Sequence, residues 1–135
     1  MKYILLCAGY ATRMYPLIEN FPKPLLDIKG KALIDYLIED LENNNLIDEY
    51  IIVSNHKFIN HFNEWKNNNK YKNKISLLDD GTTNNDNRLG AIKDIWFAIE
   101  NANINDDILV LAGDNLLDSY LKDLLIFQKR KIVML

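Results

Sequence analysis

The sequence has few of the features that mark secreted, membrane or nucleic-acid-binding proteins. Its one cysteine, Cys7, excludes an internal disulfide and is typical of a protein from a reducing compartment such as the cytoplasm. No apolar run approaches the roughly 20 residues that a membrane-spanning helix needs, so we expect no membrane partner. Basic residues are not in excess, since 16 Lys and Arg stand against 19 Asp and Glu, and we expect no nucleic-acid partner.

The 135 residues also lack internal repeats and Pro- or Ser-rich linkers, which indicates a single domain. All three prolines, Pro16, Pro22 and Pro24, lie between the first predicted strand and the first long predicted helix. This stretch is therefore a long, shaped loop, and such loops in compact domains tend to be functional. Residues 1–31 hold five Lys or Arg against two Asp or Glu, which favours a small anionic ligand near the N-terminus.

Apolar residues follow two alternating periods along the chain. Continuous apolar runs predict buried strands, and helical spacing of apolar residues predicts amphipathic helices. We expect strands at 2–7, 49–54, 74–78, 107–112 and 131–135, a short extended piece at 25–28, and helices around 33–41, 58–65, 89–99 and 121–125. This alternation predicts an α/β fold with a doubly wound, mostly parallel, Rossmann-like sheet and helices on both faces. Because the last apolar run is cut short, we expect the chain to be truncated within that fold.

The loop after the first predicted strand contains the residue types that bind phosphate groups. Gly9 lacks a Cβ, so backbone amides can approach a ligand closely, and successive amides can form a concave anion site. Arg13 supplies a fixed fork of donors, while Lys23 supplies a mobile positive charge between two prolines. The alternative is a surface loop with two ordinary cations.

The same stretch resembles the sugar nucleotidyltransferase family. The resemblance lies in Gly9, Thr12, Arg13 and Pro16, followed by the run Pro-Lys-Pro-Leu-Leu at residues 22–26. Ala11 departs from the pattern, since family members often have a second glycine there. Cys7 stands where the family usually has alanine, and we interpret it as a small core residue rather than a nucleophile.

A second signal is the run DILVLAGDN, in which Asp114 follows an apolar strand. Mg²⁺ prefers hard oxygen ligands and is commonly held by one or two carboxylates together with phosphate oxygens. The resemblance implies that Asp114 is the first metal-binding Asp of the family and that Mg²⁺ is the cofactor.

The third signal is the polar loop at residues 78–92, which leads into a predicted helix at Gly90. By resemblance, this region binds the base and sugar of the nucleotide, with Leu89-Gly90 matching a family Leu-Gly. The family's base-reading Gln has no clear counterpart, and Asp79, Asp80 and Thr83 remain candidates. The sequence therefore leaves the base open.

The resemblance implies nucleotidyl transfer from a nucleoside triphosphate to a sugar 1-phosphate, with release of pyrophosphate. Residues 1–135 would form the N-terminal nucleotide-binding part of a nucleotidyltransferase, and the family is compatible with a homo-oligomer. The alternatives are transfer to phosphocholine or another small phosphate acceptor, and a regulatory module that keeps the fold without catalysis. Arg13 and Lys23 would be catalytic. The expected nucleotide-binding residues are Cys7, Ala8, Gly9, Tyr10, Ala11, Thr12, Arg13, Lys23, Asp80, Gly81 and Gly90.

Overall fold

The computed structural model describes residues 1–8, 21–83, 90–112 and 133–134. A five-stranded parallel sheet forms its centre, with the strand order β5-β4-β1-β6-β7. The described elements are β1 (Lys2–Cys7), η2 (Lys23–Leu25), β2 (Asp27–Ile28), β3 (Lys31–Ala32), α1 (Leu33–Asn44), β4 (Glu49–Ser54), α2 (Ile59–Asn67), η3 (Lys72–Lys74), β5 (Ile75–Asp79), α3 (Ala91–Asn101), β6 (Ile108–Ala112) and β7 (Val133–Met134). The predicted helix around 121–125 lies outside the described residues.

The central strands are apolar on both faces because each face packs on a different layer of helices. In β1, Tyr3 and Leu5 belong to one buried cluster, and Ile4 and Leu6 belong to the other. The alternate side chains of β4 and β6 divide between the two clusters in the same way. A strand covered on both faces reads as a continuous apolar run, and this confirms the predicted doubly wound sheet.

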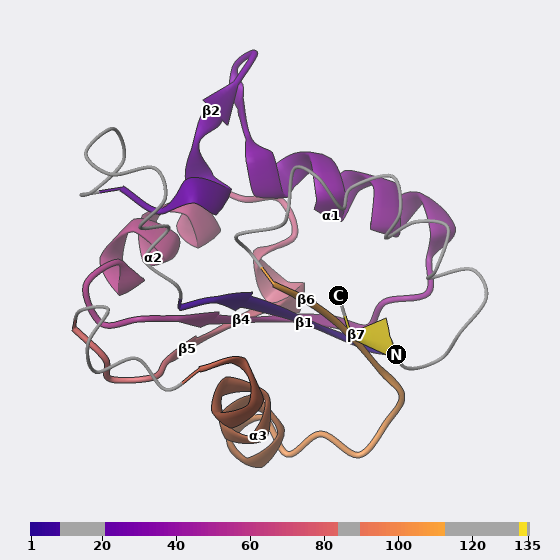
Figure 1. Ribbon diagram of the computed structural model, residues 1–135. Helices are drawn as coiled ribbons and strands as arrows, with labels where there is room; N and C mark the ends of the chain where they lie inside the picture. Colours follow the sequence, from indigo (N-terminus) through magenta and orange to yellow (C-terminus); the bar gives the residue numbers. More distant parts are fainter. Residues whose placement is uncertain (9–20, 84–89, 113–132, 135) are drawn as a thin grey trace.

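Helices α1 and α2 cover one face of the sheet, and α3 covers the other (Figure 1). Helix α1 buries an apolar stripe at helical spacing, which includes Ile34, Leu37 and Leu41. Helix α3 lies where its apolar spacing predicts it, but two of the residues that carry this spacing, Ile92 and Trp96, are 68% and 61% exposed. The described part of the chain buries α3 through Ile95 and Ala98 instead.

The segment around residues 25–28 differs from the expected single extended piece. Pro24 and Leu25 lie in the short 3-10 helix η2, and the following strands β2 and β3 form an antiparallel hairpin. Its central residues, Lys29 and Gly30, both have positive φ, at 55° and 86°. Two successive positive φ angles are typical of the type I′ turn that joins the strands of a two-residue hairpin, and Lys29-Gly30 forms such a turn.

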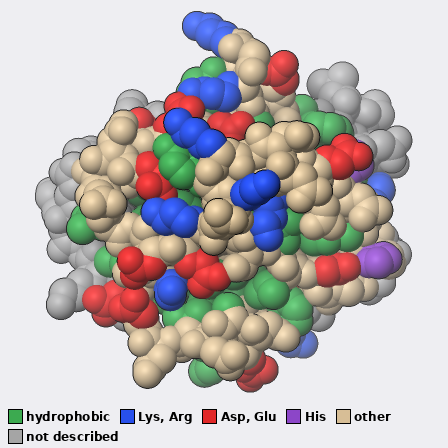
Figure 2. Space-filling view, turned by 180° about the vertical axis from the view of Figure 1, so that it is seen from behind, with side chains coloured by type: hydrophobic (Ala, Val, Ile, Leu, Met, Phe, Trp, Pro, Cys, Tyr) green, Lys and Arg blue, Asp and Glu red, His purple; other side chains and the backbone are tan. Residues whose placement is uncertain are grey.

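Basic and acidic side chains alternate across the surface seen in Figure 2. Lys2 pairs with Glu49 at 3.6 Å, and Lys74 pairs with Glu42 at 2.6 Å. Ion pairs at a surface contribute only about 0–1 kcal/mol each, so the two apolar clusters account for most of the stability. None of the described helices has the length and apolar character needed to cross a membrane.

Candidate functional site

The carboxyl ends of the parallel strands meet at one edge of the sheet, and this edge carries the candidate site. The order of the sheet reverses between β1 and β6, because β4 and β5 extend it on one side of β1 and β6 begins the other side. Doubly wound sheets bind ligands outside the carboxyl ends of the strands at such a reversal. At this edge Cys7 and Ala8, two of the predicted nucleotide-binding residues, are only 4% and 3% exposed.

Several of the predicted site residues follow the two strands that flank the reversal. The register pairs Leu6 of β1 with Ala112 of β6, so the two strands end side by side. The predicted phosphate loop begins two residues after Cys7, and Asp114 comes two residues after Ala112. The residues themselves lie outside the described part of the chain: Gly9, Tyr10, Ala11, Thr12, Arg13 and Asp114.

Lys23 begins the 3-10 helix η2, which follows the predicted phosphate loop. Pro22 gives this short helix its extended start, and its carbonyl accepts a hydrogen bond from the amide of Leu25 at 3.1 Å. Pro24 and Leu25 are buried, and η2 packs against α1 and α2. The two prolines and the buried Leu25 thus fix the backbone that carries the half-buried Lys23 side chain.

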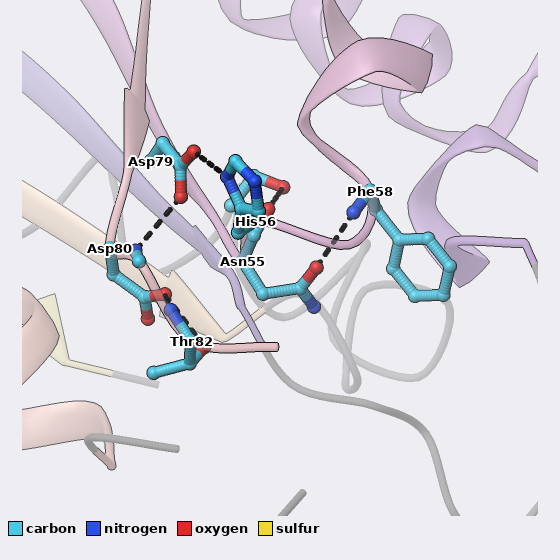
Figure 3. A network of polar contacts seen from close by, with 8 residues as sticks. Asn55, His56, Phe58, Asp79, Asp80 and Thr82 are labelled. Atoms are coloured by element: carbon cyan, nitrogen blue, oxygen red, sulfur yellow. Dashed lines mark hydrogen bonds and ion pairs between the residues drawn. The ribbon is translucent and has the colours of Figure 1, made fainter. Parts of the chain in front are cut away.

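Asn55 connects three elements directly at the edge. Its side chain is fully buried and donates to the carbonyl of Ala8 at 3.1 Å. It also accepts from the amide of Phe58 at 2.8 Å (Figure 3). The first bond fixes the point at which the chain leaves β1, and the second satisfies a free amide where α2 begins. Asn55 therefore positions the start of the predicted phosphate loop relative to α2.

His56 and Asp79 form a polar pair between the ends of β4 and β5 (Figure 3). Nδ1 of His56 lies 2.7 Å from Oδ2 of Asp79, and the other oxygen of Asp79 accepts from the amide of Gly81 at 2.8 Å. The His56 side chain is 64% exposed. The Asp79 carboxylate orients the imidazole ring of His56 through Nδ1. The other ring nitrogen, Nε2, can act as a hydrogen-bond donor or acceptor at the carboxyl edge of the sheet.

Asp80 and Thr82 shape the loop that follows β5. Oδ1 of Asp80 accepts from both the amide and the hydroxyl of Thr82, at 3.0 and 2.7 Å. The backbone ties this loop to β4, because the Asp80 amide donates to Ser54 and the His56 amide donates to Thr82, at 2.9 and 2.8 Å. The structure thus uses the Asp80 carboxyl inside the loop, which gives this predicted nucleotide-binding residue a positioning role.

Asp94 is a buried carboxyl in the first turn of α3 and is 5% exposed. Burial is the main cause that raises the pKa of Asp94 to about 7, and the neighbouring Asp80 carboxyl adds to the shift. Carboxyl groups whose pKa is raised by burial and by a neighbouring acid are common in functional sites and also occur in structural networks.

Gly90 caps the start of α3 with a φ of 87°, a conformation that side chains with a Cβ rarely adopt. Apart from the neighbours of Gly90 in the chain, no heavy atom of the described residues lies within 4 Å of the place where a Cβ would stand. The glycine is therefore explained by its backbone conformation in the described structure. The N-terminal end of α3, which carries the positive end of the helix dipole, lies beside the β5 loop, since Asp94 in its first turn neighbours Asp80.

The described residues contain no group of three His, Cys, Asp or Glu side chains that could hold a metal ion. Asp114, the carboxylate that the sequence predicts as a metal ligand, lies outside the described part of the chain. A carboxylate at the end of β6 has the oxygen chemistry that Mg²⁺ requires, so the Mg²⁺ assignment depends on this residue.

Sequence reasoning missed two of the residues that organise this edge, Asn55 and Asp94. A local signal existed for Asn55, since an Asn three residues before an apolar helix start is typical of side chains that bind free helix amides. Asp94 had no such signal, because only the tertiary fold brings it to Asp80.

A family model described as nucleotidyl transferase matches residues 2–132. The chain belongs to this family. Among curated relatives, the bifunctional protein GlmU of Methanococcus maripaludis strain C7 is 30% identical over 131 residues, covering 95% of this chain and 28% of the relative. A Sulfolobus acidocaldarius protein assigned by name to the mannose-1-phosphate guanyltransferases is 33% identical over 113 residues, covering 82% of this chain and 29% of the relative.

Solved structures agree with this family assignment. The CTP:phosphocholine cytidylyltransferase of Streptococcus pneumoniae superposes with a TM-score of 0.63 and is 27% identical, covering 83% of this chain and 44% of that one. The nucleotidyl transferase chain described here thus spans less than a third of the two curated relatives and less than half of this solved structure.

Proposed function

We propose that the chain is the nucleotide-binding part of an enzyme that transfers a nucleotidyl group from a nucleoside triphosphate to a sugar 1-phosphate. The family match over residues 2–132 carries this proposal. The strand order supports it, because the segments with the phosphate-loop signature and with Asp114 follow β1 and β6, the strands that flank the reversal. The single cysteine, Cys7, is buried, and we propose the cytoplasm as the protein's compartment.

In this reaction the phosphate oxygen of the sugar phosphate attacks the α-phosphorus in line. The bond from the α-phosphorus to the oxygen that bridges it to the β-phosphate breaks, and pyrophosphate leaves with the electron pair. No covalent enzyme intermediate is needed, so the protein contributes alignment and charge neutralisation. Backbone amides of residues 9–12 and Arg13 would hold the leaving pyrophosphate, and Lys23 would neutralise charge on the phosphates. Asp114 would hold Mg²⁺, which supplies further charge neutralisation at the α-phosphate.

A second acceptor has specific support. The choline-phosphate cytidylyltransferase of Streptococcus pneumoniae is 47% identical to this chain over 53 residues. We therefore keep phosphocholine, with CTP as the nucleotide, as the alternative to a sugar 1-phosphate. A non-catalytic module is the third reading, and the joint presence of Arg13, Lys23 and Asp114 argues against it.

Thermal unfolding with ATP, CTP, GTP, UTP and dTTP, each with and without Mg²⁺, tests the proposal. A nucleotide at a hundred times its dissociation constant adds about 2.7 kcal/mol to the free energy of unfolding, which raises the midpoint by several degrees. We expect one nucleotide to give a larger shift than the others, and Mg²⁺ to increase it. CTP as that nucleotide would favour the phosphocholine acceptor. A cooperatively folded chain whose midpoint does not respond to any of the five would contradict nucleotide binding.

Asp114→Asn is expected to remove the increase that Mg²⁺ adds to nucleotide binding, because an amide is a weaker Mg²⁺ ligand than a carboxylate. The measurement is isothermal titration of the preferred nucleotide with and without Mg²⁺. Asp107→Asn, at the opposite end of β6, makes the same change of charge and serves as the control. Equal metal dependence in Asp114→Asn and the unmodified chain would exclude Asp114 as the ligand.

A further inference from the structure

Asp80, in the loop after β5, and Asp94, in the first turn of α3, are neighbouring carboxyl groups, and each has a buried oxygen without a donor among the described residues. Oδ2 of Asp80 and Oδ1 of Asp94 are both buried, and neither has a hydrogen-bond partner within the described residues. A buried carboxylate oxygen without a donor is destabilising, and two neighbouring anions would add repulsion. The arrangement therefore requires a positive charge or a proton between them.

The surroundings favour a proton. The segments beneath α3 are β1 and β4, whose charged residues, Lys2 and Glu49, lie at the amino ends and pair with each other. On α3 itself Lys93 and Glu100 are exposed. In the β5 loop, Asp79 is paired with His56. Asp80 is thus the charged group of the described residues that faces Asp94, and no described cation reaches the pair.

The hydrogen bonds also indicate which of the two carries the proton. Oδ1 of Asp80 accepts two hydrogen bonds from Thr82, and these stabilise the ionised form of Asp80. Asp94 is more deeply buried and has no donor at Oδ1 among the described groups, which favours its neutral form. The O–H of Asp94 can then donate to Oδ2 of Asp80, and both orphaned oxygens are satisfied by one bond.

We propose that Asp80 and Asp94 share one proton and that this proton fastens the loop of residues 80–83 to the start of α3. The pair is a positioning device for the nucleotide-binding edge, and in this respect the inference rests on the proposed function. When the proton is lost to solvent, two adjacent anions remain, and their repulsion separates the loop from the helix. Raising the pH therefore loosens one side of the site.

The sign of the effect on stability follows from the direction of the pKa shift. The pKa of Asp94 rises from 3.8 in the unfolded chain to about 7 in the folded protein. Between these values the folded state holds one proton more than the unfolded state, so this contribution to stability is complete below about pH 4 and falls as pH rises. The contribution is lost by the time the pH passes about 7, and above that it no longer changes.

Asp94→Asn tests the pair, because the amide donates a permanent hydrogen bond to Asp80 and cannot lose it. We expect the equilibrium constant for unfolding of the unmodified chain to rise with pH between about 5 and 7. In Asp94→Asn this rise should be smaller by about tenfold per pH unit, which corresponds to one proton. Glu100→Gln makes the same change of charge on the exposed side of α3 and should keep the original slope. An unchanged slope in Asp94→Asn would overturn the proposal.

Two measurements guard against a variant that fails to fold. Asp80→Asn lets the new amide donate to an ionised Asp94 and removes the neighbouring charge, so it should reduce the same slope, although the burial of Asp94 remains. In the unmodified protein, the carboxyl ¹³C resonance of Asp94 should titrate near pH 7, whereas a midpoint near 4 would exclude the shared proton.

Nucleotide affinity then tests the positioning role. The probe is the nucleotide that gives the largest thermal shift. From pH 6 to pH 8, the affinity of the unmodified chain for this nucleotide should fall at least about fivefold more than the affinity of Asp94→Asn. A factor of about five is the lower end of ordinary coupling between two sites. Binding with the same pH profile in both proteins would overturn the positioning role. Absence of binding at every pH would contradict the proposed function instead, while the unfolding slopes would still decide whether the proton is shared.

Discussion

Replacing Lys23 with alanine is expected to weaken triphosphate binding by up to about a hundredfold. A hydrogen bond from an ammonium group to a phosphate contributes about 1.5–3 kcal/mol, and alanine removes both the donor and the charge. The backbone should keep its shape, because Pro22, Pro24 and the buried Leu25 hold η2 in place. Isothermal titration with the preferred nucleotide measures the loss, and thermal unfolding without nucleotide shows that the fold is intact.

Lys72→Ala is the matched control for this experiment. Lys72 is exposed and lies in η3, just before β5, at the opposite end of the sheet from the candidate site. Its removal changes the net charge by the same amount and should alter the affinity by less than about twofold at ordinary ionic strength. Equal losses in the two variants would indicate a general charge effect, and unfolding of Lys23→Ala would assign Lys23 a structural role.

Asn55→Ala should lower the free energy of unfolding by about 3 kcal/mol. The substitution breaks the bonds to Ala8 and Phe58 and leaves a buried carbonyl and a buried amide without partners. Each unsatisfied buried group costs about 1–3 kcal/mol, so the combined loss is large for a single polar side chain. Urea-induced unfolding followed by far-ultraviolet circular dichroism measures the difference.

Asn55→Asp separates the two bonds. The aspartate keeps an acceptor for the Phe58 amide but places an oxygen against the carbonyl of Ala8, so it should also destabilise the fold. Asn101→Ala is the control, because Asn101 is exposed and bonds only to its own helix in the described structure. Its loss should stay within about 0.5 kcal/mol. A comparably small loss for Asn55→Ala would show that Asn55 does not connect β1 to α2 energetically.

The strands were predictable because burial on both faces leaves a direct mark on the sequence. Residues 49–54 do not alternate between apolar and polar side chains, as a strand with one exposed face would, and β4 occupies the same six residues. The α/β class and the parallel sheet follow from these runs and from the helices between them. The position of Lys23 between two prolines also indicated a constrained backbone, and η2 shows how those prolines act.

Residue contacts that depend on the tertiary fold were not predictable. Asp80 and Asp94 are separated by a polar loop, and nothing in their local sequence indicates that one carboxyl is buried against the other. The exposure of Ile92 and Trp96 illustrates the same limit, since helical spacing identifies a helix but not the neighbours that cover it. The hairpin of β2 and β3 is likewise fixed by the turn at Lys29-Gly30 rather than by apolar periodicity.

The central place of β1 has a consequence for how the protein is made. Leu5 of β1 pairs with Ile52 of β4 on one side and with Leu111 of β6 on the other. Because β6 lies about a hundred residues further along the chain, β1 leaves the ribosome long before this second neighbour is synthesised. At about 5–20 residues per second, β6 follows β1 after roughly 5–20 s. During that interval one edge of an apolar strand has no partner and is open to association with other nascent chains. The reversal that creates the ligand edge forms only when β6 arrives, so the candidate site cannot be complete before β6 has been synthesised.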